Sequence, residues 1–151
     1  MELQVGVKIL LKNKDNKYLV LHRSAEKYPG VRAKWDIAGG RIDKGIPLLE
    51  NLKREVAEET GLSIIGKPKL LAAQDILKTD KHVVRLTYIG SGEGEVKLSD
   101  EHTEYKWLNL DEILALESLD KYFKELLTKF NLDQHLACRR RELEKSHIKD
   151  E

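Results

Sequence analysis

The chain has 151 residues, the size of one ordinary domain. It carries 27 Lys and Arg residues against 26 Asp and Glu residues, and this net charge of +1 gives no reason to expect a nucleic acid or an anionic membrane as partner. Apolar residues make up 40% of the chain, enough to fill a core, and the single cysteine excludes an intramolecular disulfide. We therefore expect a folded protein of the reducing cytoplasm.

The N-terminal segment and the longest apolar runs show whether a signal peptide or a membrane-spanning helix is expected. Met1-Glu2-Leu3-Gln4 has no basic stretch followed by an apolar one, so a signal peptide is not expected. No run approaches the roughly 20 apolar residues that a bilayer-spanning helix needs. We therefore expect no membrane partner.

The first third of the chain predicts a hairpin, a loop and a short strand. Residues 5–11 and 18–21 are apolar and rich in β-formers, and the polar turn between them contains Asp and Asn. Residues 22–34 are loop-like, with a Pro-Gly pair as a turn signal. Residues 35–38 predict a short strand that ends at two consecutive glycines.

Residues 47–60 carry the clearest helix signal in the chain. Pro47 suits a first helical turn, where its missing N–H group is no loss, and Gly61 suits a left-handed C-terminal cap. The residues at i, i+3 and i+7 form one apolar stripe: Leu49, Leu52 and Val56.

The remaining chain predicts further strands over 69–77, 82–90 and 104–110, a polar loop over 90–95 and an amphipathic helix over 119–130. No repeat or linker interrupts this order, so we expect a single α/β domain over residues 1–133. Residues 134–151 predict a charged tail or helix end. Three consecutive arginines in this tail are more typical of a solvated helix end than of a nucleic-acid site.

Three carboxylates share one face of the helix predicted over residues 47–60. At about 100° per residue, Glu55, Glu58 and Glu59 lie on one flank, roughly a quarter-turn from the apolar stripe. Like charges at this spacing repel by roughly a few tenths of a kcal/mol per pair, and the helix macrodipole disfavours anions near the C-terminus. A divalent cation with oxygen ligands would relieve the repulsion. The alternative is a solvated acidic patch, which helices commonly carry.

Residues 40–62 resemble the Nudix box, the signature of hydrolases that act on a nucleoside diphosphate linked to another group. The box reads G-x5-E-x7-R-E-U-x-E-E-x-G-U, where U is a bulky aliphatic residue. The matching positions are Gly40, Arg54, Glu55, Val56, Glu58, Glu59, Gly61 and Leu62. Two positions depart from the family: Ile46 replaces the first box glutamate, and Ala38 stands where proline is usual. The resemblance implies an α/β/α sandwich with a mixed β-sheet.

The resemblance also implies a metal site. The residues that would hold Mg²⁺ or Mn²⁺ are Glu55, Glu58, Glu59 and the carbonyl of Gly39. Arg54 would orient the glutamates. Ile46 costs one carboxylate, which implies a weaker site or a changed number of metal ions.

The implied chemistry is attack of water on a pyrophosphate phosphorus, with Glu55, Glu58 and Arg54 in the catalytic machinery. Several family members use a further glutamate on a later loop as ligand or general base. Glu101 is the candidate here and Glu104 the second choice, with a solvated loop acid as the alternative.

Four residues are candidates for substrate binding. Tyr28 and Trp35 would stack on a base, and Arg23 and Arg41 would contact phosphate. The alternative is a core position for Trp35 and a solvated loop for the others.

The implied substrate is a nucleotide, and a nucleoside or deoxynucleoside triphosphate is favoured. Residues 78–80 lack the proline of the ADP-ribose branch and the tyrosine of the dinucleoside-polyphosphate branch. ADP-ribose or another nucleotide sugar is the next choice, and a catalytically weakened nucleotide-binding module stays open because of Ile46. An isopentenyl diphosphate isomerase is disfavoured because Cys138, the sole cysteine, lies in the tail. The oligomeric state stays open, a homodimer included.

Overall fold

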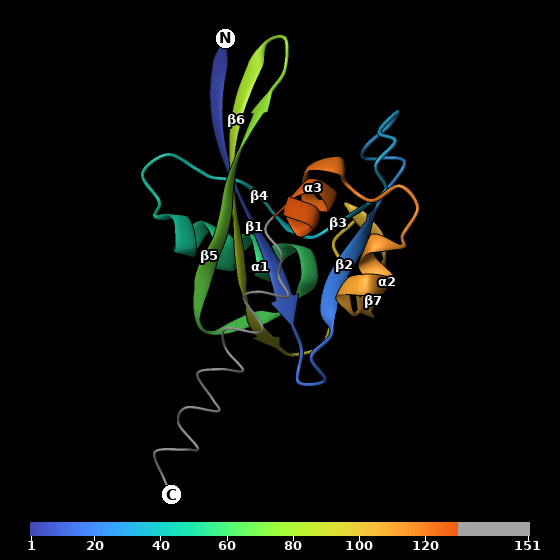
Figure 1. The fold of residues 1–151 in the computed structure, drawn as a ribbon. Helices are drawn as coiled ribbons and strands as arrows, with labels where there is room; N and C mark the ends of the chain where they lie inside the picture. The colour runs from blue at the N-terminus through green and yellow to red at the C-terminus, as the bar shows by residue number, and fades with distance from the viewer. Residues whose placement is uncertain (130–151) are drawn as a thin grey trace, which may run out of the picture.

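The computed structural model describes residues 1–129, and its organising element is a long first strand at the centre of a mixed β-sheet (Figure 1). The strands are β1 (Glu2–Lys12), β2 (Tyr18–Arg23), β3 (Trp35–Asp36), β4 (Ala38–Arg41), β5 (Ser63–Leu77), β6 (Lys81–Glu93) and β7 (His102–Leu108). The helices are α1 (Leu48–Thr60), α2 (Leu110–Leu114) and α3 (Lys121–Lys129). The strand order is β3-β2-β1-β6-β5, with β4 also paired to β1 and β7 to β2. β1 runs parallel to β6 and antiparallel to β2 and β4.

Two apolar cores lie on opposite faces of this sheet, because successive side chains of a strand point to opposite sides. The core on the α1 side contains Val7, Ile9 and Leu11 of β1 together with Leu52 and Val56. The core on the other side contains Leu10 of β1, Ile113 of α2, and Phe123 and Leu126 of α3. The sheet is thus sandwiched between helices, as Figure 1 shows, and the expected α/β sandwich is confirmed.

Helix α1 follows its predicted pattern closely. Leu52 and Val56 are fully buried, which contributes about 1.5–3 kcal/mol each to folding, and Leu49 is half-buried. Gly61 has a φ of 72° and donates its N–H to Ala57 O at the C-terminus. The helix begins one residue later than expected, because Pro47 has an extended ψ of 152°.

The prediction of a loop over residues 90–95 is wrong at its start. β6 continues to Glu93, because its last residues pair with the first residues of β5, Ser63, Ile64 and Ile65. Gly92 lets β6 pack closely against Leu11, since a Cβ there would lie 2.8 Å from a methyl carbon of Leu11.

The strand expected over 104–110 also differs from β7. It starts earlier, at His102, and stops at Leu108 because Asn109 begins a new helix. The Asn109 side chain accepts from Glu112 N, and the Glu112 side chain accepts from Asn109 N, which is a capping box. The tail expected over 134–151 and the last residue of the helix expected over 119–130 lie outside the described residues. In residues 1–129 no helix has the length and apolar character needed to cross a membrane.

Candidate metal and phosphate site

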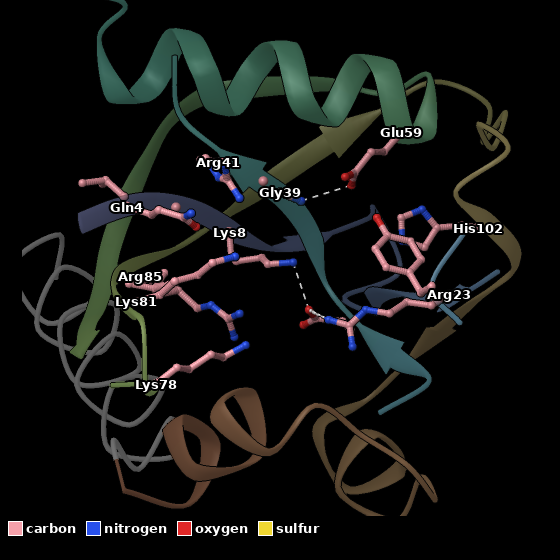
Figure 2. A pocket seen from close by; sticks show the side chains of 16 residues that line it. Gln4, Lys8, Arg23, Gly39, Arg41, Glu59, Lys78, Lys81, Arg85 and His102 are labelled. Carbon is pink, nitrogen blue, oxygen red and sulfur yellow. Dashed lines mark hydrogen bonds and ion pairs between the residues drawn. The ribbon is translucent and has the colours of Figure 1, made fainter. Parts of the chain in front are cut away.

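A cavity of about 400 Å³ lies over the sheet next to the C-terminal end of α1 (Figure 2). Gln4, Gly6 and Lys8 alternate along β1 and line it. These residues are two apart, like Leu10, so the cavity is on the α3 side of the sheet. The other lining residues with polar or backbone groups in the cavity include Arg23, Asp36, Gly39, Arg41, Glu59, Lys78, Lys81, Arg85 and His102.

The glycine pair lets α1 bring its carboxylates to the edge of this cavity. Gly39 has a φ of 145°, and a Cβ there would lie 2.0 Å from Val7 O, so only glycine fits. Its N–H donates to Glu59 Oε2 at 3.1 Å, as Figure 2 shows. A Cβ on Gly40 would lie 2.8 Å from the carboxyl carbon of Glu55. Gly40 therefore makes room for Glu55, whereas Gly39 permits close contact with β1 and donates its N–H to Glu59.

Burial and mutual repulsion make these carboxylates hard to ionise. Glu59 is only 6% exposed, and burial raises its pKa to about 7 against the opposing effects of Lys8 and the Gly39 N–H. Burial also raises the pKa of Glu55, and Glu101 raises the pKa of both groups. The fold thus brings the predicted residues Glu55, Glu59 and Glu101 together. A positive charge among them would stabilise their ionised forms.

The raised pKa of Glu59 predicts a pH-dependent stability of the metal-free protein. The unfolded chain releases this proton near the ordinary value of 4.5 and the folded chain near 7. The folded state holds more protons between these values, so its stability is full below the lower one and falls as the pH rises through the higher one. In EDTA, we expect the melting temperature to fall from about pH 5 to about pH 8 more steeply in wild type than in Glu59→Gln. If the melting temperatures of wild type and Glu59→Gln fall equally with pH, this prediction is wrong.

The Arg54 guanidinium contacts three acidic side chains. Its Nη2 atom is 3.1 Å from Asp43 Oδ2 and 3.5 Å from Glu55 Oε1, and its Nη1 atom is 3.8 Å from Glu58 Oε1. The Asn51 side chain also accepts from Arg54 at 3.0 Å. Arg54 therefore has the geometry of a residue that orients Glu55 and Glu58.

The donor chemistry fits a hard divalent cation, because the groups at this edge are carboxylate and carbonyl oxygens. Among residues 1–129, no three Asp, Glu, His or Cys side chains are arranged as a complete ligand set. The Glu59 carboxylate accepts a hydrogen bond from the Gly39 N–H. The Glu58 side chain is 59% exposed, and its Oε1 atom lies 3.8 Å from Arg54 Nη1. Binding therefore requires rotation of Glu55 and Glu58, which exposed or half-buried side chains can undergo.

A network of ion pairs forms the cationic wall of the cavity. Asp36, 2% exposed, accepts from Lys8 Nζ at 2.9 Å and from Arg23 Nη2 at 2.7 Å (Figure 2). Burial alone would raise the pKa of Asp36, but Lys8 and Arg23 hold it below its usual range. Asp120 lies 3.1 Å from Arg85 and 3.5 Å from Arg23.

The sequence prediction did not include Lys8, Asp36, Arg85 or His102. A signal for Lys8 was present, since it is the one charge between Val5 and Leu11 in a strand of apolar residues. His102 is buried and its Nδ1 atom has no hydrogen-bond partner. Burial lowers the pKa of His102 to about 4, and Lys8 and Arg23 contribute to this lowering.

The structure separates the predicted substrate-binding residues into two groups. Arg23, Arg41 and Tyr28 line the cavity, and the Tyr28 hydroxyl donates to Glu101 Oε2 at 3.4 Å. Burial raises the pKa of Tyr28 to about 12. Trp35 instead belongs to the core, 8% exposed, with its ring 4.8 Å from that of His22. Trp35 is therefore a core residue and does not line the cavity.

A second hollow continues from the first. Arg23, Tyr28, Lys78, Val83 and Arg85 line both. The second is more apolar, and its further walls include Val31, Ile76, Leu119 and Tyr122. Glu104, the second choice for the later glutamate, is exposed on β7 and lines neither hollow.

Two curated proteins resemble the chain in sequence. The bis(5'-nucleosyl)-tetraphosphatase [asymmetrical] of Rattus norvegicus is 30% identical over 96 residues, 58% of this chain and 63% of the rat protein. The chain thus matches less than two thirds of that relative's length. The RNA pyrophosphohydrolase of Pelagibacter ubique (strain HTCC1062) is 25% identical over 134 residues, 77% of this chain and 82% of that protein.

Solved structures resemble the chain, and a family profile matches most of its length. The crystal structure of the MutT protein from Methanosarcina mazei Go1 has a TM-score of 0.75 and 32% identity, covering 88% of this chain and 96% of that chain. The MutT protein from Bacillus halodurans has a TM-score of 0.68 and 26% identity, covering 83% and 80%. The profile of the NUDIX domain matches residues 2–130. From the match over residues 2–130 and these structural likenesses, the chain belongs to the Nudix hydrolase family and is MutT-like.

Proposed function

We propose that the chain hydrolyses a pyrophosphate bond of a nucleotide in the cytoplasm, with Mg²⁺ or Mn²⁺ held by Glu55, Glu58, Glu59 and the Gly39 carbonyl. One observation carries this proposal: the buried Glu59 carboxylate and the cations Lys8 and Arg23 line the same cavity. Carboxylates on one side suit a divalent cation, and cations on the other suit the phosphates it would bind.

Residues that line this cavity, together with Glu101 beside Tyr28, have separate roles in hydrolysis. When bound, a divalent cation supplies positive charge that polarises phosphoryl oxygens. Lys8 and Arg23 hold the phosphate oxygens, and Asp36 fixes both side chains through its ion pairs at 2.9 and 2.7 Å. Glu101 accepts the proton of the attacking water, and the Tyr28 hydroxyl orients its carboxylate.

A nucleoside triphosphate is the first choice of substrate. The cationic cavity suits its phosphates, and the adjoining apolar hollow, with Tyr122 and Leu119, suits a base. The names of the two relatives favour a second candidate, a dinucleoside tetraphosphate or the phosphorylated end of an RNA. ADP-ribose stays the next alternative.

A panel of nucleotides tests this function. Nucleoside triphosphates, a dinucleoside tetraphosphate, a triphosphate-ended RNA and ADP-ribose would be incubated with Mg²⁺, with and without excess EDTA, and released phosphate or pyrophosphate measured. We expect turnover that needs the metal, with the triphosphates hydrolysed fastest. Tight nucleotide binding without turnover in any arm would instead identify a non-catalytic binding module.

Ile46 provides a further test, because it stands where the family has a carboxylate. Its side chain is 38% exposed in the turn before α1, so a charged residue fits there. Ile46→Glu places an anion near the helix N-terminus, where the dipole contributes about 0.3–1 kcal/mol. The same charge attracts a nearby cation, and about 0.4–1 kcal/mol of this attraction gives roughly two- to fivefold tighter Mg²⁺ binding or faster turnover. Ile46→Gln is the uncharged control, and identical behaviour of all three proteins would show that the departure is neutral.

A further inference from the structure

The outer edge of strand β5 is protected in its first half and unprotected in its second. The strand order ends at β5, and no strand in residues 1–129 pairs with its outer side (Figure 1). Residues 66–69 carry features that keep an edge from pairing, namely a glycine, two lysines and a proline. The segment Leu70–Leu77 has no glycine, no proline and only one charged residue, Asp75. Such an edge is a template for pairing with another strand.

Exposed leucines lie at the two ends of this unprotected segment. Leu70 is 56% exposed and Leu77 is 69% exposed. Both lie on the same face of the sheet, because their partners on β6 are Tyr88 and His82, which are an even number of residues apart. This face is the α1 side, since Tyr88 belongs to the core on that side. Leu3 of β1, which is also exposed, pairs with His82 and extends the same apolar surface.

The register of β5 makes the segment complementary to a second copy of itself. Its residues pair one by one with those of β6, except for Leu71, which lies in a bulge. Counted in these paired positions, Gln74 is three from Leu70 and three from Leu77. An antiparallel pair centred on Gln74 therefore places Leu70 of each copy opposite Leu77 of the other. Side chains in such pairs have their Cβ atoms about 5 Å apart, so the leucines would be in contact.

This pairing opposes no like charges within Leu70–Leu77 and covers the exposed leucines. Asp75 lies opposite Ala73 of the second copy and is already 2.7 Å from His82. Each leucine loses roughly 100 Å² of apolar surface, which is roughly 400 Å² for the four leucines. With the backbone and the other side chains of the paired positions, the contact is on the order of 1,000 Å² in total. This is the lower end of specific interfaces, so the contact suits a dimer that dissociates reversibly.

We propose that the chain forms a two-fold symmetric homodimer through antiparallel pairing of the β5 edges over Leu70–Leu77. The two sheets then become one continuous sheet, and each copy closes the open edge of the other. The two-fold axis is perpendicular to the sheet at Gln74, whose partner on β6, Arg85, lines the cavity. The cavities of the two copies therefore open on the same face of the joined sheet. The dimer does not depend on the proposed hydrolysis.

Cysteine crosslinking tests the register of this pairing. In the full chain with Cys138→Ser, the further substitution Gln74→Cys places two thiols opposite each other across the axis, close enough for a disulfide. We expect mild oxidation to convert most of this variant into a covalent dimer on a denaturing gel. The matched control is Leu77→Cys, whose thiols would be about 20 Å apart, and it should stay monomeric. Equal crosslinking of the two variants, or none of Gln74→Cys, would overturn the proposal.

Sedimentation velocity of the full chain over a range of concentrations tests the association itself. We expect wild type to dissociate with a constant of micromolar order. The variant Leu70→Lys with Leu77→Lys opposes like charges and should associate at least about tenfold more weakly. Ile65→Lys, at an exposed position of β5 outside the paired segment, should associate like wild type. Melting temperatures would show that all three proteins are folded.

Two results would contradict the dimer. One is wild type that stays monomeric at about 100 μM, and the other is undiminished association of the double lysine variant. Hydrogen exchange then identifies what covers the edge. In a dimer, the amides of Leu70–Leu77 should exchange more slowly as the concentration rises. Slow exchange in a monomer would show that another segment of the same chain covers β5, and the proposal would be wrong.

Discussion

Glu58→Gln is expected to fold like wild type and to lose activity by about a hundredfold or more. The Glu58 side chain is 59% exposed, and its one ionic contact among the described residues is Arg54 at 3.8 Å, so the substitution disturbs no core residue. Glutamine keeps the size of the side chain but removes the negative charge that a divalent cation needs. Steady-state rates at saturating Mg²⁺ would measure the loss, and circular dichroism would confirm the fold.

The matched control for this experiment is Glu50→Gln. Glu50 is an exposed acid in the first turn of α1, on the same helix and outside the box pattern. Its rate should stay within about twofold of wild type, since exposed substitutions away from a site change energies by about 0.5 kcal/mol or less. A wild-type rate in Glu58→Gln, or an undiminished rate of wild type in excess EDTA, would show that the carboxylates of α1 hold no catalytic metal.

Millimolar Mg²⁺ or Mn²⁺ is expected to raise the melting temperature of wild type by roughly 5–10 °C. The unfolded chain cannot gather the three glutamates, so the cation binds the native state alone. At a hundredfold excess over Kd this adds about 2.7 kcal/mol to the free energy of unfolding. Differential scanning calorimetry in EDTA and in metal would give the increase.

The double variant Glu55→Gln with Glu59→Gln should abolish that increase. Without metal it should be no less stable than wild type, because it removes a buried charge and the repulsion from Glu101. The amide oxygen introduced by Glu59→Gln would still accept the Gly39 N–H, which the carboxylate of Glu59 accepts at 3.1 Å. If wild type melts independently of metal and the metal-free variant is destabilised, the glutamates are structural.

The predictions that the structure confirms depended on local sequence patterns. Helix α1 follows from its apolar stripe and from Gly61, since spacing and cap chemistry depend on neighbours in sequence. The arrangement of glutamates beside Gly39 followed from the resemblance to the Nudix box. The loop predicted at residue 90 is strand, because strand pairing depends on a partner that a local pattern does not contain.

The cationic wall was not predicted, for the same physical reason. Lys8 and Arg85 are far apart in sequence and meet only because β1 and β6 pair in parallel. Asp36 lies beside the two cations only after β3 joins β2, and the sequence of a two-residue strand does not indicate such a partner. Trp35 was ambiguous between base stacking and the core, and its burial depends on Leu119 and Phe123 of a later segment.

Direct titration with Mn²⁺ tests most directly whether the carboxylates of α1 form a metal site. Electron paramagnetic resonance would count free Mn²⁺ over wild type and over the double variant Glu55→Gln with Glu59→Gln, at a pH above the pKa of about 7 of Glu59. We expect saturable binding in wild type and at least about a hundredfold weaker binding in the variant. Equal Mn²⁺ affinity in the two proteins would contradict it.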